Sequence, residues 1–154
     1  MCKVFQILQC NQAAAYGKQI FASGSGIEEG LLCKYASGST VELCGDTETP
    51  VGYARGLRTG VYTPTSRLYA DGEAMALTRG DGMLAASVDF FVEGSMPSPN
   101  AAIYAGANGL MTTTAGSNKQ VGKCQRVEQR VEPIGGVGVN QDVAIIWFDI
   151  PASL

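Results

Sequence analysis

The stretch MLAASVDFFV, residues 83–92, decides the fold class. Successive side chains in a strand point to opposite faces, so residues two apart share one face. One face of this stretch carries Leu84, Ala86, Val88, Phe90 and Val92. The same period-two alternation recurs wherever a period is visible, and it predicts short strands. A helix signal is confined to residues 11–18, where a turn or two is expected. The chain is therefore predicted to be all-β.

The segments on either side of this stretch predict further strands. Residues 73–79 also alternate, and Gly80-Asp81-Gly82 lies between them and residue 83. Glycines accept the positive φ of a tight turn, so residues 73–79 and 83–92 are expected to pair as an antiparallel hairpin. Val143 to Ile150 is nearly continuously apolar, which predicts a strand buried on both faces and ended by Pro151. Trp147, the only tryptophan, lies in it and is interpreted as core, with a ligand-stacking platform as the alternative.

An internal repeat organises the chain. Tyr35 and Tyr104 lie 69 positions apart, and Val51-Gly52 recurs 70 positions later as Val121-Gly122. The strand-like segments that follow the two copies begin at residues 73 and 142, again 69 positions apart. Agreement of three offsets indicates a tandem duplication.

The repeat predicts the domain organisation. Two β-units, at about 27–92 and 93–150, are expected to bury one face each against the other, as a small β-sandwich or barrel within a single domain, 27–154. Residues 1–26 lie outside the repeat and are interpreted as an extended N-terminal arm. The alternative is an N-terminal strand of the same domain.

Composition excludes several classes of function. The 154 residues contain no histidine, which removes Ser-His-Asp and Cys-His mechanisms and His-ligated metals. A net charge of -3 argues against nucleic acid as a partner, because duplex binding needs a concentrated basic face. The longest aliphatic and aromatic run is six residues, Val143 to Phe148, far below the roughly 20 that cross a bilayer. A soluble protein of one domain is expected.

No motif in the sequence indicates a catalytic, cofactor or metal site. The five cysteines form no C-x-x-C pair and are interpreted as small buried apolar residues. The glycine-rich stretches lack the lysine and following helix of a phosphate-binding loop. A histidine-free glycosidase would need a carboxylate pair, but the candidates fall on predicted turns or an outward strand face. These candidates are Asp71, Glu73, Asp81, Asp89 and Glu93. The protein is predicted not to be an enzyme.

The order of several short motifs resembles that of the small capsid cement, or head decoration, proteins of tailed phages. In the first half the motifs are Ile27-Glu28-Glu29-Gly30-Leu31-Leu32, Pro50-Val51-Gly52-Tyr53-Ala54 and Gly72-Glu73. In the second half they are Ile103-Tyr104-Ala105-Gly106-Ala107-Asn108-Gly109, Thr112-Thr113-Thr114, Asn118-Lys119-Gln120-Val121-Gly122 and the strand from Val143 to Phe148. The resemblance covers roughly residues 27–150. Two departures from it are Lys123-Cys124-Gln125 after Val121-Gly122, and a long polar connection over residues 55–70.

The resemblance implies a structural role without catalysis. Such a protein binds the major capsid protein on the outer surface of an assembled head, after synthesis in the cytoplasm of the host bacterium, and does so in many copies, often as homotrimers. It has no cofactor, and neither nucleic acid nor a membrane is its partner. An alternative is a β-module of a phage tail or fibre that binds host glycan. Apolar residues of the predicted arm and side chains of the 55–70 connection are the candidate contacts with the capsid or within a trimer. They are Val4, Phe5, Ile7, Leu8, Arg58, Tyr62 and Arg67.

Overall fold

The computed structural model describes residues 5–10, 21–37, 39–55, 69, 71–72, 74–134 and 137–150. The described part is all-β, as predicted, apart from two 3-10 helices of three residues each. The strands are β1 Phe5–Cys10, β2 Phe21–Ser23, β3 Leu32–Ser37, β4 Thr40–Leu43, β5 Gly52–Arg55, β6 Ala74–Thr78, β7 Gly80–Ser87, β8 Ala102–Ala105, β9 Met111–Thr112, β10 Gln120–Ile134 and β11 Val137–Ile150. The 3-10 helices are η2 Val88–Phe90 and η3 Ala107–Gly109. The helix signal at residues 11–18 lies outside the described residues.

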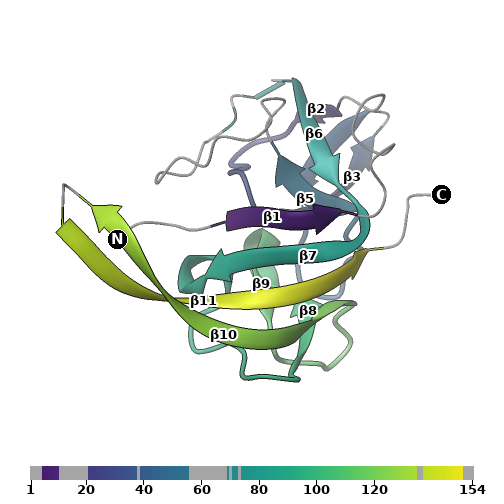
Figure 1. The fold of residues 1–154 in the computed structure, drawn as a ribbon. Coiled ribbons are helices and arrows are strands. Elements are labelled where there is room, and N and C mark those ends of the chain that lie inside the picture. Colours follow the sequence, from purple (N-terminus) through teal and green to yellow (C-terminus); the bar gives the residue numbers. More distant parts are fainter. Residues whose placement is uncertain are drawn as a thin grey trace.

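Two sheets make up the body (Figure 1). One has six strands in the order β1-β7-β11-β10-β8-β9, all paired antiparallel. The other has five strands in the order β2-β4-β3-β5-β6, and β6 also pairs with β2, so the pairing runs round a ring. Within the ring only β2 and β4 run parallel. Two sheets enclosing a common core agree with the predicted sandwich or barrel.

The strand register repeats between the two predicted units. The predicted match of Tyr35 with Tyr104 is one position out, because the register aligns Lys34 with Tyr104. Four strands of the ring, β4-β3-β5-β6, have the same order and directions as β9-β8-β10-β11 of the six-stranded sheet. The pair Lys34↔Glu42 recurs as Tyr104↔Thr112, with both residues 70 positions later. Cys33↔Gly52 likewise recurs as Ile103↔Gly122. The repeat is therefore one of backbone pairing, which explains why few side chains are identical.

The connections between the strands repeat as well. The amide of Gly30 donates to the carbonyl of Ala54, and 70 positions later the amide of Asn100 donates to the carbonyl of Cys124. Gly30 and Asn100 both have positive φ, of 97° and 70°. Glycine and asparagine are the residues that adopt this backbone conformation most readily. Equivalent turns thus keep a turn-forming residue even where the strands diverge.

A shared core joins the two copies. Its buried residues come from the first copy, from the second and from β7. Tyr53 of β5 illustrates the contact, because its ring centroid lies 5.8 Å from that of Phe148 on β11. Its hydroxyl donates to the sulfur of Met111 on β9, at 3.2 Å. A second cluster, which includes Ile27 and Met75, fills the ring. The first copy thus has a core of its own inside the ring and also shares a core with the second copy.

Three cysteines lie in these cores as free thiols, as interpreted from the sequence. Cys33, Cys44 and Cys124 are all buried. Burial disfavours the thiolate and raises the pKa of Cys33 to about 12. It likewise raises the pKa of Cys44 to about 11, against a small opposing effect of Lys34. These two thiols are therefore protonated and unreactive at neutral pH.

The predicted hairpin of residues 73–79 with 83–92 is wrong. β6 pairs with β2 and β5 in the ring, whereas β7 pairs with β1 and β11 in the other sheet. The chain crosses between the sheets at Arg79, which is buried and donates from Nη1 to the hydroxyl of Tyr35 at 3.0 Å. Gly80 has a φ of 77°, which permits the change of direction. The strand predicted over 83–92 ends at Ser87, where η2 begins.

The N-terminal segment forms strands of the same domain rather than a free arm where it is described. β1 pairs with β7 along the edge of the six-stranded sheet, and Phe5 and Ile7 pack against the shared core. β2 closes the ring by pairing with β4 and β6. The alternative interpretation of this segment, a strand of the domain, is thus confirmed for residues 5–10 and 21–23.

Candidate interaction surface

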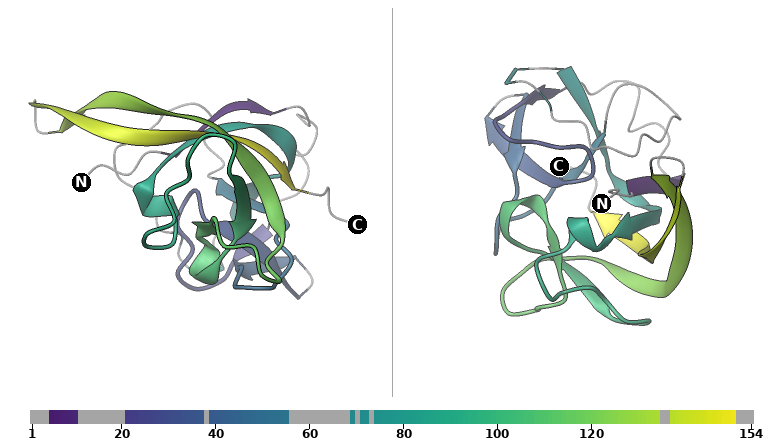
Figure 2. Two further views of the ribbon diagram at one scale, coloured as in Figure 1. Left: turned by 90° about the horizontal axis from the view of Figure 1, so that it is seen from below. Right: turned by 90° about the vertical axis from the view of Figure 1, so that its left-hand side faces the viewer.

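The most extended feature of the molecule is the hairpin of β10 and β11. It carries the two strands past the end of β7 and away from the body, as Figure 1 and the left panel of Figure 2 show. The two strands pair with each other from Gly122↔Phe148 out to Ile134↔Val137. β7 pairs with β11 only over residues 143–150, and β8 pairs with β10 only over residues 120–123. We call residues 129–134 and 137–142 the projecting ribbon.

Both edges of the ribbon lack a neighbouring strand within the described residues. Val131 is 66% exposed, more than any other large apolar side chain in the described part. Further out, the sequence continues with Ile134, Val137 and Val139, while Glu132 is the only charged residue from 131 to 140. An isolated two-stranded ribbon is marginally stable in water. A surface of this kind is suited to contact with another molecule.

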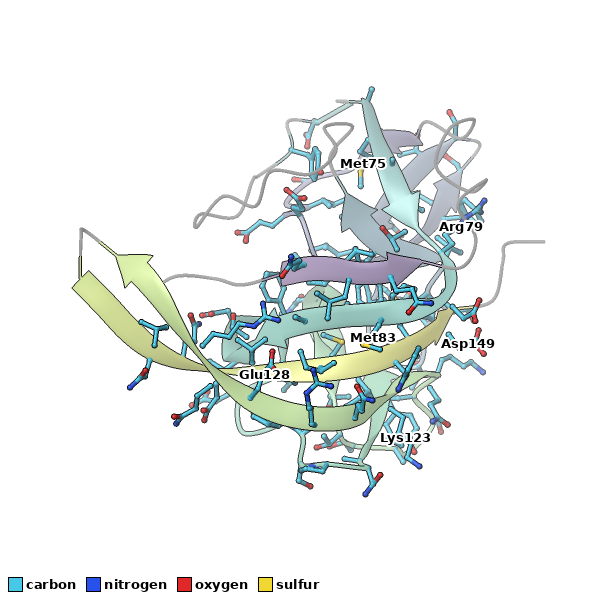
Figure 3. All side chains as sticks on the ribbon, viewed as in Figure 1. Met75, Arg79, Met83, Lys123, Glu128 and Asp149 are labelled. Atoms are coloured by element: carbon cyan, nitrogen blue, oxygen red, sulfur yellow. The ribbon has the colours of Figure 1, made fainter. Side chains whose placement is uncertain are left out.

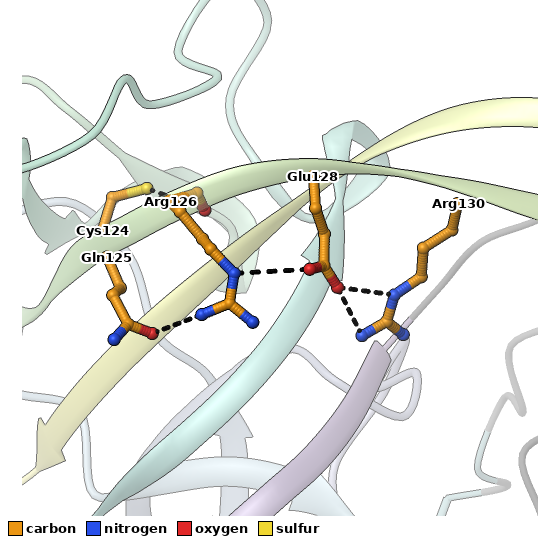
Figure 4. Close-up of polar contacts among 5 residues, drawn as sticks. All are labelled: Cys124, Gln125, Arg126, Glu128 and Arg130. Atoms are coloured by element: carbon orange, nitrogen blue, oxygen red, sulfur yellow. Dashed lines mark hydrogen bonds and ion pairs between the residues drawn. The ribbon is translucent and has the colours of Figure 1, made fainter.

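The base of the ribbon is held by polar contacts across the outer face of the six-stranded sheet (Figure 4). The carboxylate of Glu128 accepts from Arg126 Nε at 3.3 Å and from Arg130 Nε at 3.1 Å. Arg130 Nη1 also donates to the side-chain oxygen of Gln6 on β1, at 3.1 Å. In register, Arg126 lies opposite Ile145 and Glu128 opposite Val143. We call Arg126, Glu128 and Arg130 the charge ladder. Its members all lie on β10, and the bond from Arg130 to Gln6 joins it to β1.

This ladder also accounts for a small apolar cluster on the outer face. Ala85, Val143 and Ile145 form it, and each is 0% exposed. Long side chains such as arginine bury their aliphatic stems along apolar surface while the charged head stays in water. Arg126 and Arg130 are placed to do so over the neighbouring strand. The outer face is thus polar at its surface and apolar beneath.

The charge ladder can be detected through the pKa of Glu128. Hydrogen bonding to Arg130, and to a smaller extent the other contacts with Arg130 and Arg126, holds the pKa of this carboxyl below its ordinary value of 4.5. A depressed pKa means that the stabilising contribution is present above the ordinary pKa and is lost as the pH falls through the lowered one. We expect Arg130→Gln to raise the pKa of Glu128 more than Arg126→Gln does, in a carboxyl-carbon NMR titration. High salt should shift the wild-type value upward. An unchanged pKa in Arg130→Gln would contradict the ladder.

A second exposed feature is a row of four side chains across the outer face. Cross-strand register places Gln9, Met83, Trp147 and Lys123 side by side on β1, β7, β11 and β10. Trp147 is 43% exposed, so its interpretation as core is wrong and the open alternative of a surface platform describes its position. Its even-numbered neighbours Ile146 and Phe148 point into the core instead. We call these four residues the Trp147 row. Figure 3 labels Met83, Lys123 and, at the end of β11, Asp149.

The candidate contact residues are placed as follows. Phe5 and Ile7 are partly buried in the core, whereas Leu8 is 40% exposed and stays a candidate. Leu8 lies at a bulge between β1 and β7, where the register shifts. Val4 and the side chains Arg58, Tyr62 and Arg67 lie outside the described residues.

The candidate carboxylates are dispersed over separate elements. Asp71 and Glu93 lie in turns, and Asp89 of η2 accepts from the hydroxyl of Ser87, the last residue of β7, at 2.9 Å. Asp81 lies on β7 opposite Asp149, a residue that the sequence did not single out. Glu73 lies outside the described residues. Within the described part no three Cys, Asp or Glu side chains are grouped as a metal site would require.

The sequence offered only weak signals for the ribbon. Gly135-Gly136 between two apolar stretches is compatible with a hairpin turn, but it does not show that the strands leave the body. Comparison of the chain with models of protein families, with curated proteins and with solved structures found no match. Among the described residues there is also no helix long and apolar enough to cross a membrane.

Proposed function

We propose that the protein is a structural virion protein that binds the outer surface of an assembled phage capsid and cements neighbouring major capsid protein subunits. The observation that supports this proposal is the combination of a packed two-sheet body with a ribbon that projects from it. A cement protein must hold its shape while a head is under internal pressure. It must also reach more than one neighbouring subunit.

The described body meets the first requirement. Two copies of one β-unit share a core that includes Tyr53, Phe148 and Met111, so neither sheet can shift without the other. The ribbon supports the second requirement, since β10 and β11 pair with each other beyond the strands that flank them. Attachment in many copies raises the effective concentration of each contact, so modest individual interfaces suffice.

The test is binding to undecorated heads of the encoding phage. Purified protein is mixed with heads, and co-sedimentation and the melting temperature of the capsid are measured. Saturable binding and a higher melting temperature are expected. Absence of both would overturn the proposal.

Two variants show whether the ribbon takes part. In one, residues 131–140 are replaced by Asn-Gly, so that Arg130 and Gln141, which already pair, are joined by a two-residue turn. In the other, Val88→Lys, an exposed apolar side chain that lies outside the ribbon, on η2, is altered. The first variant should bind heads at least about tenfold more weakly, and the second should bind like the wild type. Equal binding by both variants would remove the ribbon from the attachment.

A second candidate function is a tail or fibre module that binds host glycan. The observation that favours it is the exposure of Trp147, because aromatic faces on a flat sheet stack on sugar rings. Lys123 beside it and Asp149 two residues along β11 offer polar contacts. Binding to a glycan array that Trp147→Ala abolishes, together with failure to bind heads, would favour this function over the first.

A further inference from the structure

The only asparagine of the chain that is followed by a glycine, Asn108, lies at a contact between the two copies. Gly109 ends η3 in the second copy, and its amide donates to the carbonyl of Cys44 in the first copy at 2.6 Å. A Cβ at Gly109 would stand 2.9 Å from the carbonyl oxygen of Leu32 and 3.0 Å from Cδ2 of Leu43. The backbone of η3 therefore rests directly on the first copy.

An Asn-Gly pair can change its covalent structure without an enzyme. The backbone nitrogen of Gly109, after its proton is lost to water, attacks Cγ of Asn108. A carbon–nitrogen bond forms there, the bond to the side-chain nitrogen breaks, and ammonia leaves. Water then opens the resulting succinimide ring at one of its two carbonyls and gives aspartate or isoaspartate. A glycine in the second position favours the attack because it has no side chain to hinder it.

The fold holds Asn108 in a conformation from which this reaction cannot start. Ring closure needs the Cβ of Asn108 and the nitrogen of Gly109 on the same side of the bond between Cα and the carbonyl carbon of Asn108. The observed φ of 56° and ψ of 33° place these two atoms on nearly opposite sides. Gly109 is also buried, with its N–H bonded to Cys44, although Asn108 itself is exposed. The reaction therefore requires that η3 separates from the first copy.

We propose that Asn108 is a site of spontaneous deamidation that the contact between the two copies keeps closed. Opening of this contact frees the N–H of Gly109, and closing it stops the reaction again. Isoaspartate adds a negative charge and lengthens the main chain of η3 by a methylene group, so the modified chain does not restore the bond to Cys44. Deamidation thereby makes an opening irreversible and limits the lifetime of the folded protein. This inference does not depend on the proposed function, because its test needs no capsid.

The first test compares the wild-type protein with a synthetic peptide of residues 105–112 at neutral pH. Mass spectrometry of proteolytic fragments follows the loss of the Asn108 amide, and NMR hydrogen exchange measures the protection of the Gly109 N–H. The protein should deamidate at least about a hundredfold more slowly than the peptide. This factor should equal the protection of Gly109 to within about threefold, because both reactions need the open contact. Equal rates in protein and peptide would overturn the proposal, as would a larger disagreement with the protection.

Two variants separate opening of this contact from unfolding of the whole protein. Leu43→Ala removes a side chain that lies against Gly109. Val143→Ala is the matched control, because Val143 is buried in the cluster on the outer face of the six-stranded sheet. Leu43→Ala should deamidate at Asn108 at least about tenfold faster than the wild type, and Val143→Ala less than about threefold faster. Urea denaturation confirms that both variants are folded. Equal rates in the two variants would place the reaction in globally unfolded molecules and overturn the proposal.

Discussion

Replacing Gly122 by alanine is expected to lower the free energy of unfolding by about 3 kcal/mol, at the upper end of the usual cost of overpacking. Gly122 lies on β10 between Phe148 of β11 and Ile103 of β8. A Cβ there would stand 2.3 Å from the carbonyl oxygen of Trp147 and 3.1 Å from the Cα of Phe148. Both atoms belong to the backbone of a central strand, so the main chain itself would have to move. Urea denaturation followed by the fluorescence of Trp147 measures the loss.

Two further glycines provide the comparison. Gly116 has a φ of 49° and nothing within 4 Å of its Cβ position, so Gly116→Ala should cost only about 1 kcal/mol, from backbone strain. Gly52, the counterpart of Gly122 in the first copy, would place a Cβ 2.8 Å from the carbonyl oxygen of Thr78. Gly52→Ala should therefore be costly too, but less so. Equal losses for Gly116→Ala and Gly122→Ala would show that the close approach on β10 is not maintained in solution.

Replacing Tyr53 by alanine is expected to cost about 4 kcal/mol, within the usual range for large aromatic residues cut back in a core. The side chain is 0% exposed, and its ring centroid lies 5.5 Å from that of Phe5 and 5.8 Å from that of Phe148. Its deletion leaves a cavity between the ring of strands and the six-stranded sheet. Far-UV circular dichroism and the fluorescence of Trp147 should report one common transition, shifted to lower urea concentration.

Tyr53→Phe is the matched control. It keeps the ring contacts and removes only the hydroxyl, whose partner is the sulfur of Met111, a weak acceptor. Its cost should stay below about 1 kcal/mol. Separate transitions for the two probes in Tyr53→Ala would contradict a shared core, because Trp147 reports on the six-stranded sheet alone.

The class of fold and the repeat could be predicted because both depend on patterns of neighbouring residues in the sequence. Alternation of apolar and polar residues marks strands wherever one face is buried. Val51-Gly52 and Val121-Gly122 recur because Gly52 and Gly122 meet the same constraint, a backbone carbonyl of the next strand close to the position of a Cβ. A close approach of two backbones thus keeps a glycine at the equivalent position in both copies even when the neighbouring side chains differ.

Strand partners were harder to predict, because they depend on which surfaces remain uncovered after the chain has collapsed. The glycines at 80 and 82 are compatible with a hairpin turn, yet β6 finds its partners in β2 and β5. Gly80 serves a crossover between the sheets instead. The apolar residues Phe5 and Ile7 are compatible with a contact arm, yet they cover the shared core next to Tyr53.

The sequence by itself determined that the protein is all-β, that it contains two copies of one unit, and that histidine chemistry is absent. Only the tertiary structure decided which surfaces are left for a partner. Trp147 belongs to an apolar strand, but its position on β11, between β7 and β10, leaves it 43% exposed. The ribbon likewise arises because β10 and β11 extend beyond the ends of the strands beside them. Local sequence specifies how a strand is built, whereas exposure depends on where its neighbours end.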